Sequence, residues 1–153
     1  MGTYDRFRLA RYMRAIWYDE LGLAQPDTDL EGRRNGMAGP RIRPGLTGER
    51  QTLVCEHNVA PHVSKFSTPS MIGLMEQASI NAVDGLLDEN QTSVGFEVNI
   101  RHIAPADIGA TITAHAELTE VDRNRLTFRV EAFDGDRKVG EGTHRRAIIS
   151  KDG

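Results

Sequence analysis

Cysteine is almost absent from this sequence, because Cys55 is the only one among 153 residues. A single cysteine excludes an intrachain disulfide and a zinc site built from cysteines. No long hydrophobic run is present, so the sequence predicts no membrane span and no apolar signal-peptide segment. No spacing of histidine and acidic residues indicates a metal site, and no glycine-rich loop matches a nucleotide-binding motif. We therefore expect a soluble, cytoplasmic protein that needs no metal or other cofactor.

A strong excess of one charge is also missing. The 19 basic and 22 acidic residues leave a net charge of −3 at pH 7. This balance argues against general binding to nucleic acid, which favours a strongly basic surface. The length is sufficient for one domain with a real hydrophobic core.

The first 45 residues differ in pattern from the rest. Apolar residues recur at helical spacing over Thr3–Leu23, which predicts an amphipathic helix. Glycine and proline then interrupt every period over residues 24–48, which predicts a long irregular arm. We expect the apolar stripe of the helix to dock on the body or on a second subunit, with a membrane surface or a partner protein as the alternatives. We assign residues 1–45 to this helix and arm, and residues 46–153 to the folded body.

In the body, the order of the predicted elements indicates a sheet that packs around one helix. Apolar and polar residues alternate most clearly in the strands before and after the turn at residues 122–124. The short connections between the later strands predict antiparallel pairing. In full, we predict a strand at 50–58, a helix at 68–87, and strands at 92–103, 111–121, 126–132 and 139–149. This is an α+β layout in which a five-stranded antiparallel sheet curls around a central buried helix.

Glu76 lies in the middle of the predicted helix, among apolar residues on almost every side. A buried carboxylate is costly unless a neighbour pairs with it or the protein uses it. Thr68 and Pro69 stand where an N-cap and a first helical residue are expected. Alternatively, Glu76 belongs to a solvated stripe with Gln77, Asn81 and Asp84.

Three segments of the body form a recognisable set of motifs, Phe66–Glu76 (FSTPSMIGLME), Thr92–His102 (TSVGFEVNIRH) and Gly140–His144 (GEGTH). In these motifs, and over about residues 46–150, the sequence resembles the fluoroacetyl-CoA thioesterase-like family of hotdog-fold acyl-CoA thioesterases. The resemblance implies the hotdog fold, hydrolysis of an acyl-CoA thioester, and a homodimer with pockets at the subunit boundary. CoA then enters as part of the substrate, and an acyl-carrier protein stays open as a second carrier.

The resemblance also implies a set of site residues. Thr68, Glu76 and His102 match the catalytic residues of the family, and Gly95 matches a glycine that approaches the substrate. Glu76 either attacks the thioester or activates a water, and the sequence does not separate the two roles. Taken alone, Thr68 is a helix cap, His102 a structural histidine and Gly95 a bulge residue.

Three further residues are assigned to substrate binding. Phe66 begins the first motif, and Arg101 and Arg145 are candidates to contact CoA phosphates, with Lys65 and Arg146 as further candidates. A solvated sheet edge explains the arginines equally well. The loop at residues 59–66 does not resemble the substrate-covering segment of the fluoroacetyl-specific member, so the resemblance does not assign the acyl group.

Two other functions compete with thioester hydrolysis. One is a hotdog hydratase or dehydratase, although the sequence lacks the helix signature with Asp and His that we expect there. The other is a non-catalytic module that binds acyl-CoA or acyl-carrier protein, against which the intact Thr68, Glu76 and His102 argue.

Overall fold

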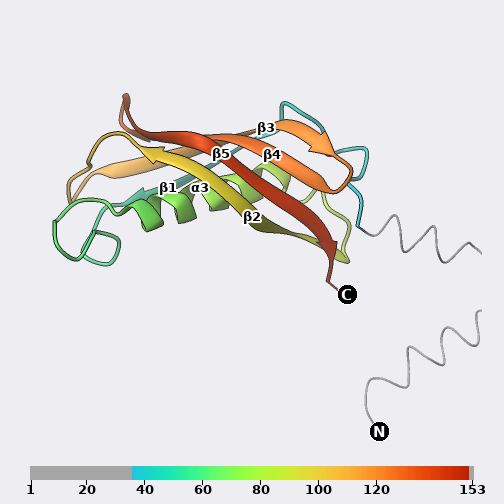
Figure 1. The fold of residues 1–153 in the computed structure, drawn as a ribbon, viewed down its shortest axis with the longest axis horizontal. Helices are drawn as coiled ribbons and strands as arrows, with labels where there is room; N and C mark the ends of the chain where they lie inside the picture. Colours follow the sequence, from blue (N-terminus) through green and yellow to red (C-terminus); the bar gives the residue numbers. More distant parts are fainter. Residues whose placement is uncertain (1–35, 152–153) are drawn as a thin grey trace, which may run out of the picture. The chain divides into compact units, whose positions relative to one another are not determined.

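The computed structural model describes residues 36–151 of the chain (Figure 1). The predicted helix Thr3–Leu23 and its docking lie outside the described residues and stay predictions. The described elements are β1 (Thr47–Leu53), α3 (Thr68–Val83), β2 (Gln91–His102), β3 (Thr111–Asp122), β4 (Arg125–Asp134) and β5 (Arg137–Ser150). The predicted order of one strand, one helix and four strands is confirmed.

The five strands form one antiparallel sheet in the order β1-β3-β4-β5-β2. Tight turns join β3 to β4 and β4 to β5, with Arg123 and Gly135 in the left-handed conformation at φ 57° and 59°. Strands joined by such short turns pair in antiparallel fashion, as predicted. The two edge strands are β1 and β2, so β2 has one side free of any strand of the described residues.

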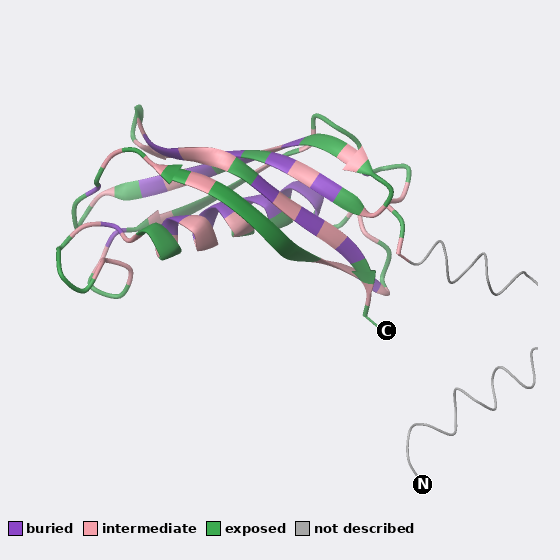
Figure 2. Cartoon of the chain, in the orientation of Figure 1, coloured by how far each residue is buried: buried purple, intermediate pink, exposed green. Residues whose placement is uncertain are grey.

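Helix α3 lies along one face of the sheet (Figure 1). Its buried residues face the sheet and are Met71, Leu74, Met75, Ala78, Ser79, Ala82 and Val83. On its opposite side, no other element of residues 36–151 covers Gln77, Ile80 and Asn81, which are exposed. Figure 2 shows α3 with both buried and exposed stretches. The predicted architecture, a five-stranded sheet curled around one helix, is confirmed, and the helix buries the side that faces the sheet.

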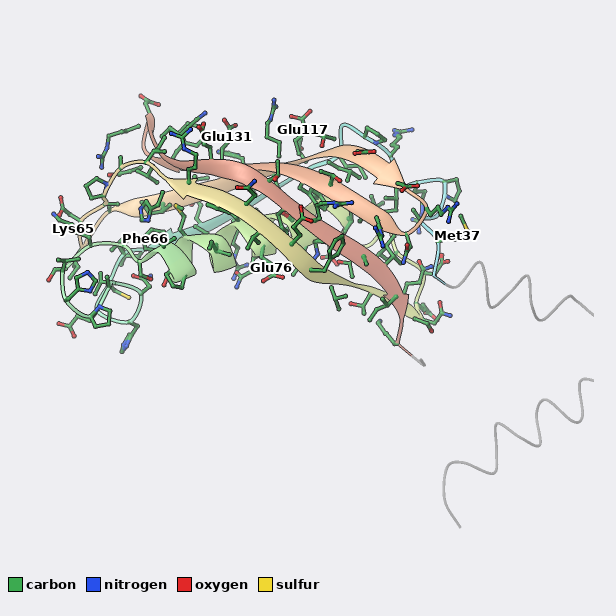
Figure 3. All side chains as sticks on the ribbon, viewed as in Figure 1. Met37, Lys65, Phe66, Glu76, Glu117 and Glu131 are labelled. Carbon is green, nitrogen blue, oxygen red and sulfur yellow. The ribbon has the colours of Figure 1, made fainter. Side chains whose placement is uncertain are left out.

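Alternation along the strands separates the core from the outer face of the sheet. On β3 and β4 the buried residues are Ile112, Ala114, Ala116, Leu118, Leu126, Phe128, Val130 and Ala132. The residues between them point outward and pair by charge, for example Arg129 with Glu117 and Lys138 with Glu131. Figure 3 shows Glu117 and Glu131 on one face of the sheet. Glu76 belongs to α3, which lies on the opposite face. The sheet therefore has a charged outer face and an apolar inner face.

Some element bounds differ from the predicted ones. Helix α3 ends at Val83 rather than at residue 87, because Gly85 takes the left-handed conformation that ends helices. β1 begins at Thr47, earlier than predicted. Residues 36–45, placed in the arm by sequence, contact the body: Ile42 belongs to the core, and the Gly45 N–H donates to the Leu118 carbonyl at 2.8 Å.

Candidate active site

The start of α3 presents the first half of the site. The N-cap is Ser67, whose hydroxyl accepts from the Ser70 N–H at 3.2 Å, so the prediction that Thr68 caps the helix is wrong. Thr68 is thereby left free of the cap, and its Oγ1 lies 2.9 Å from Nδ1 of His102. Because these residues are 34 positions apart, the contact depends on the fold rather than on local geometry.

The capping geometry separates two neighbouring hydroxyls. We expect Ser67→Ala to lower the free energy of unfolding by about 1 kcal/mol through loss of the cap. Thr68→Ala should cost clearly less stability, because its hydroxyl contacts His102 instead. Thermal unfolding of the two variants checks this, and a larger loss for Thr68→Ala would contradict the assigned cap.

His102 is the last residue of β2, and its neighbour Arg101 points to the opposite face of the strand. Its Nε2 is buried and has no hydrogen-bond partner within residues 36–151. An unpaired buried nitrogen costs roughly 1–3 kcal/mol, so a nitrogen with no protein partner needs an explanation, of which a catalytic role is one. One ring nitrogen of His102 therefore contacts Thr68, and the other has no partner among residues 36–151.

The second half of the site surrounds Glu76, in the middle of α3. The helix places Glu76 eight residues beyond Thr68, which corresponds to about 12 Å along the axis. Its Oε1 lies 2.8 Å from Nη1 of Arg146 and 3.9 Å from Nε2 of His144. The Glu76 side chain is 42% exposed, whereas the side chains of its two partners are each 3% exposed. The carboxylate is thus half open to solvent and anchored to a buried cation.

Arg146 is held by β2 as well as by Glu76. Its Nε donates to the Ser93 hydroxyl at 3.0 Å, and its Nη2 donates to the Ser93 carbonyl at 2.7 Å. Its Nη1 also lies 3.2 Å from Nε2 of His144. This burial removes Arg146 from the candidates for phosphate contact, which require an accessible guanidinium. Sequence reasoning missed its role, although Arg146 and His144 alternate with the apolar Ile148 along β5.

His144 is enclosed by the same elements. Its Nδ1 lies 3.0 Å from the backbone carbonyl oxygen of Glu97. Burial lowers the pKa of His144 below its ordinary value, and the charge of Arg146 lowers it further. We therefore treat His144 as a neutral imidazole at neutral pH.

Gly95 leaves room for both groups. A methyl group at this position would lie 2.6 Å from Oε1 of Glu76 and 2.8 Å from Cε1 of His144. The register with β5 shifts between Gly95 and Glu97, so the residue also lies at a bulge. The close approach is present in the structure, and the contact of Gly95 with substrate stays a prediction.

The other predicted binding residues lie apart from this cluster. Phe66 is buried in the core and lines a cavity of about 230 Å³ beside Ser70 and Gln77 on the open side of α3. Arg101 pairs with Glu141 at 3.8 Å on the outer face of the sheet.

Arg145 also points outward, because it follows the inward-facing His144 on β5. It pairs with Glu97 at 3.2 Å, and its guanidinium lies 5.2 Å from the ring centre of Phe96. The structure therefore brings Thr68 to His102 and Gly95 to Glu76, but it places neither Arg101 nor Arg145 beside them.

The first turn of α3 offers few donors to a substrate oxygen. Pro69 has no N–H, and the N–H groups of Ser70 and Met71 are bonded to Ser67. The N–H groups of this turn are thus largely bonded within the cap. Helix N-termini often bind anions through free N–H groups, and this one has few of them.

Within residues 36–151, no three or more His, Cys, Asp and Glu side chains gather in a way that could hold a metal ion. No helix of that part of the chain has the length and apolar character needed to cross a membrane.

Among the described residues, a curled antiparallel sheet packs on one helix that carries an acid, and a histidine ends β2, which is the fold of the hotdog thioesterases. Within this class, the sequence profile of the fluoroacetyl-CoA-specific thioesterases matches residues 49–152. The chain belongs to that family. The matched segment contains Thr68, Glu76, Gly95 and His102.

Individual relatives agree with this assignment. The fluoroacetyl-CoA thioesterase of Streptantibioticus cattleyicolor is 42% identical over 84 residues, which span 55% of this chain and 60% of the relative. A crystal structure of a variant fluoroacetyl-CoA-specific thioesterase with fluoroacetate and CoA is 33% identical. The superposition covers 72% of this chain and 98% of the related chain, with a TM-score of 0.66. A Thermus thermophilus member of the thioesterase superfamily is 25% identical, covers 74% and 88% of the two chains, and has a TM-score of 0.71.

Proposed function

We propose that this protein hydrolyses an acyl-CoA thioester with Thr68, His102 and Glu76. The observation that carries the proposal is the 2.9 Å contact between Thr68 and His102, inside a segment that matches a thioesterase family. A related structure holds CoA with fluoroacetate, which supports CoA as the carrier. The proposal includes a cytoplasmic location. It leaves the acyl group open, because the loop at residues 59–66 does not resemble the substrate-covering segment of the fluoroacetyl-specific member.

The chemistry follows from what each side chain offers. Hydrolysis requires a base or nucleophile, a group that moves the proton, and a place for the thioester carbonyl. Glu76 provides the carboxylate, which either attacks the carbonyl carbon or takes a proton from the attacking water. His102 and Thr68 provide a linked pair of donor and acceptor for the proton and the carbonyl oxygen. Gly95 keeps the space next to the carboxylate clear of side-chain atoms.

Release of free CoA measures this function directly. The purified protein is incubated with acyl-CoA esters of increasing chain length, and the thiol is detected with a thiol reagent. We expect turnover with at least one ester. A protein that binds these esters without releasing thiol would support the non-catalytic module, and release of an enoyl or hydroxyacyl product with the thioester intact would support a hydratase.

The position of Glu76 bears on how the site is assembled. Thr68 and Glu76 are separated by about two turns of a rigid helix, and each has its own set of partners in the chain. One chain therefore presents two half-sites, one with Thr68 and His102 and the other with Glu76 and Gly95. We propose that a second copy completes the site, so that each active site combines one half from each subunit.

The free side of β2 is the surface that we propose for this pairing. β2 is an edge strand with exposed Val94, Phe96 and Val98. An exposed apolar edge strand tends to pair with another strand. Antiparallel pairing of two β2 strands about an axis near Asn99 would place Gly95 close to the partner subunit's His102. The two sheets then form one continuous sheet with both α3 helices on the same face. This places the Thr68–His102 half-site of one subunit near the Glu76–Gly95 half-site of the other.

Light scattering tests the dimer. We expect a mass of twice the 17.0 kDa chain at micromolar concentration. Val98→Arg should shift the protein toward a monomer with little activity, since it places a charge on the paired edge. The matched control is Leu53→Arg, an exposed apolar residue on the other edge strand, which should leave the dimer intact. A monomeric wild type with full activity would contradict the shared site.

A further inference from the structure

His144 is buried beside Glu76, yet the chemistry above gives it no role. Its Nδ1 lies 3.0 Å from the Glu97 carbonyl oxygen. Because a carbonyl only accepts, Nδ1 carries the hydrogen, and Nε2 of the neutral ring is then an acceptor. Nε2 lies 3.2 Å from Nη1 of Arg146, so it accepts a hydrogen bond from the guanidinium.

One nitrogen of Arg146 therefore serves both neighbours. Nη1 has two hydrogens in the plane of the guanidinium, and it lies 3.2 Å from His144 and 2.8 Å from Oε1 of Glu76. Both acceptors lie within hydrogen-bond distance of Nη1, so one of its hydrogens is donated to His144 and the other to the carboxylate. Ser93 fixes the remaining side of the guanidinium through its hydroxyl and carbonyl.

We propose that His144 is a positioning residue for Glu76, which acts as a neutral acceptor that fixes Arg146 and, through Arg146, the carboxylate. The effect of His144 on turnover rests on the proposed thioesterase function. The contacts of His144 with Arg146 and Glu97 do not depend on that function. The side chain touches no reacting atom in this account. It acts by keeping Glu76 in one orientation, and small displacements of reacting groups cost much of the rate.

Protonation of His144 would reverse this arrangement. The charged groups that face the ring are Glu76 from α3 and Arg146 from β5, while β2 contributes the Glu97 carbonyl. The Glu97 carboxylate pairs with Arg145, and the β4 neighbour in register is the uncharged Phe128. A hydrogen on Nε2 would meet the N–H groups of Arg146, so the acceptor would be lost and the guanidinium would have to move.

Burial lowers the pKa of His144, so the folded state resists this proton while the unfolded state takes it up at its ordinary pKa near 6.5. Between the ordinary pKa and the lowered one, the unfolded protein binds more protons than the folded one. Stability therefore rises with pH across this window and falls as the pH drops through it. Variants that lack the imidazole should lose this part of the pH dependence.

Two substitutions separate the two nitrogens of the ring. In His144→Gln the side-chain amide can place its oxygen near the position of Nε2 and accept from Arg146, but it cannot titrate. In His144→Asn the shorter amide reaches only the position of Nδ1 and leaves Arg146 without its acceptor. We expect His144→Asn to lower kcat by up to about 100-fold with little change in KM. His144→Gln should retain kcat close to wild type and lose the pH dependence of stability described above.

The matched control is His115→Asn, which alters an exposed histidine on the outer face of the sheet and should leave kcat unchanged. Equal activity of His144→Asn and His144→Gln would overturn the proposal. A kcat of His144→Asn equal to wild type would also overturn it.

Nitrogen NMR of the wild-type protein tests the contact without any activity measurement. At neutral pH we expect the His144 signals of a neutral ring with hydrogen on Nδ1, and separate signals for the Arg146 Nη groups because the guanidinium does not rotate. In His144→Asn the Arg146 Nη1 signal should shift because it loses one acceptor, while the bonds to Ser93 and Glu76 still hold the guanidinium. Hydrogen on Nε2, or freely rotating Arg146 in the wild type, would overturn the inference even if the enzyme is active. If the expected signals are present but no ester is hydrolysed, the proposed function fails and the contact stands.

Discussion

Replacing Glu76 with glutamine is expected to lower kcat by about 100-fold or more while the fold is retained. The amide keeps the shape of the side chain, and its oxygen can still accept from Arg146. It can neither take a proton from water nor attack a thioester as a carboxylate does. The loss should therefore appear in kcat rather than in thermal stability.

Steady-state kinetics on the best acyl-CoA substrate, together with thermal unfolding, measures this effect. The matched control is Glu117→Gln, which alters an ion pair with Arg129 on the outer face of the sheet. Near-wild-type kcat for Glu76→Gln would assign Glu76 to a solvated, structural ion pair. If activity is lost as expected, a single turnover of the wild-type protein in oxygen-18 water adds a test. An unlabelled Glu76 oxygen in the product acid shows that Glu76 attacked the thioester and that water then cleaved the anhydride at the Glu76 carbonyl.

Replacing His102 with alanine is expected to have an effect on kcat of similar size, about 100-fold. The substitution removes the only side chain that the structure places on the Thr68 hydroxyl within residues 36–151. Adding Thr68→Ala should then cost much less than it does alone, because residues that act as a unit are not additive.

Arg101→Ala is the matched control for His102→Ala. Arg101 is the preceding residue on the same strand, but it faces the outer side and pairs with Glu141. Its removal should leave kcat unchanged, and a rise in KM alone would support the predicted contact with CoA phosphates. Additive losses for Thr68 and His102 would show that the two side chains act separately.

The sequence was sufficient to predict the plan of the body. Strands β3 and β4 alternate between apolar and polar residues over most of their length, which fixes their faces. The short turn between them fixes their antiparallel pairing. The turn at residues 122–124 is as predicted. The start of α3 was placed within one residue, although the cap is Ser67 rather than Thr68, since neighbouring hydroxyls have the same capping chemistry.

Side-chain partners across the sheet were harder to predict. Arg145 and Arg146 are adjacent and chemically identical, yet one is on the outer face and the other is buried against Glu76. The alternation that includes Ile148 distinguishes them, but a buried arginine is rare enough that its neighbours must be known first. Likewise, the sequence shows a spacing of eight positions from Thr68 to Glu76, whereas only the structure shows that their side chains have separate partners among the described residues.

The boundary between the N-terminal arm and the body was also hard to predict from sequence. Glycine and proline predicted an irregular arm up to residue 45, and the described part of that arm is indeed without helix or strand. It nevertheless supplies Ile42 to the core and a backbone hydrogen bond from Gly45 to β3. A truncation that tests the role of the N-terminal segment should therefore remove residues 1–35 and keep Ile42.

Mixing two inactive variants tests the shared active site most directly. Thr68→Ala and Glu76→Gln proteins are purified separately, combined in equal amounts, and allowed to exchange subunits. If each site takes Thr68 from one chain and Glu76 from the other, each mixed dimer has one intact site and one site with both substitutions. Random exchange should then restore about one quarter of the wild-type activity. If both residues act within one chain, no mixed dimer has an intact site, and exchanged subunits that stay inactive would contradict the account.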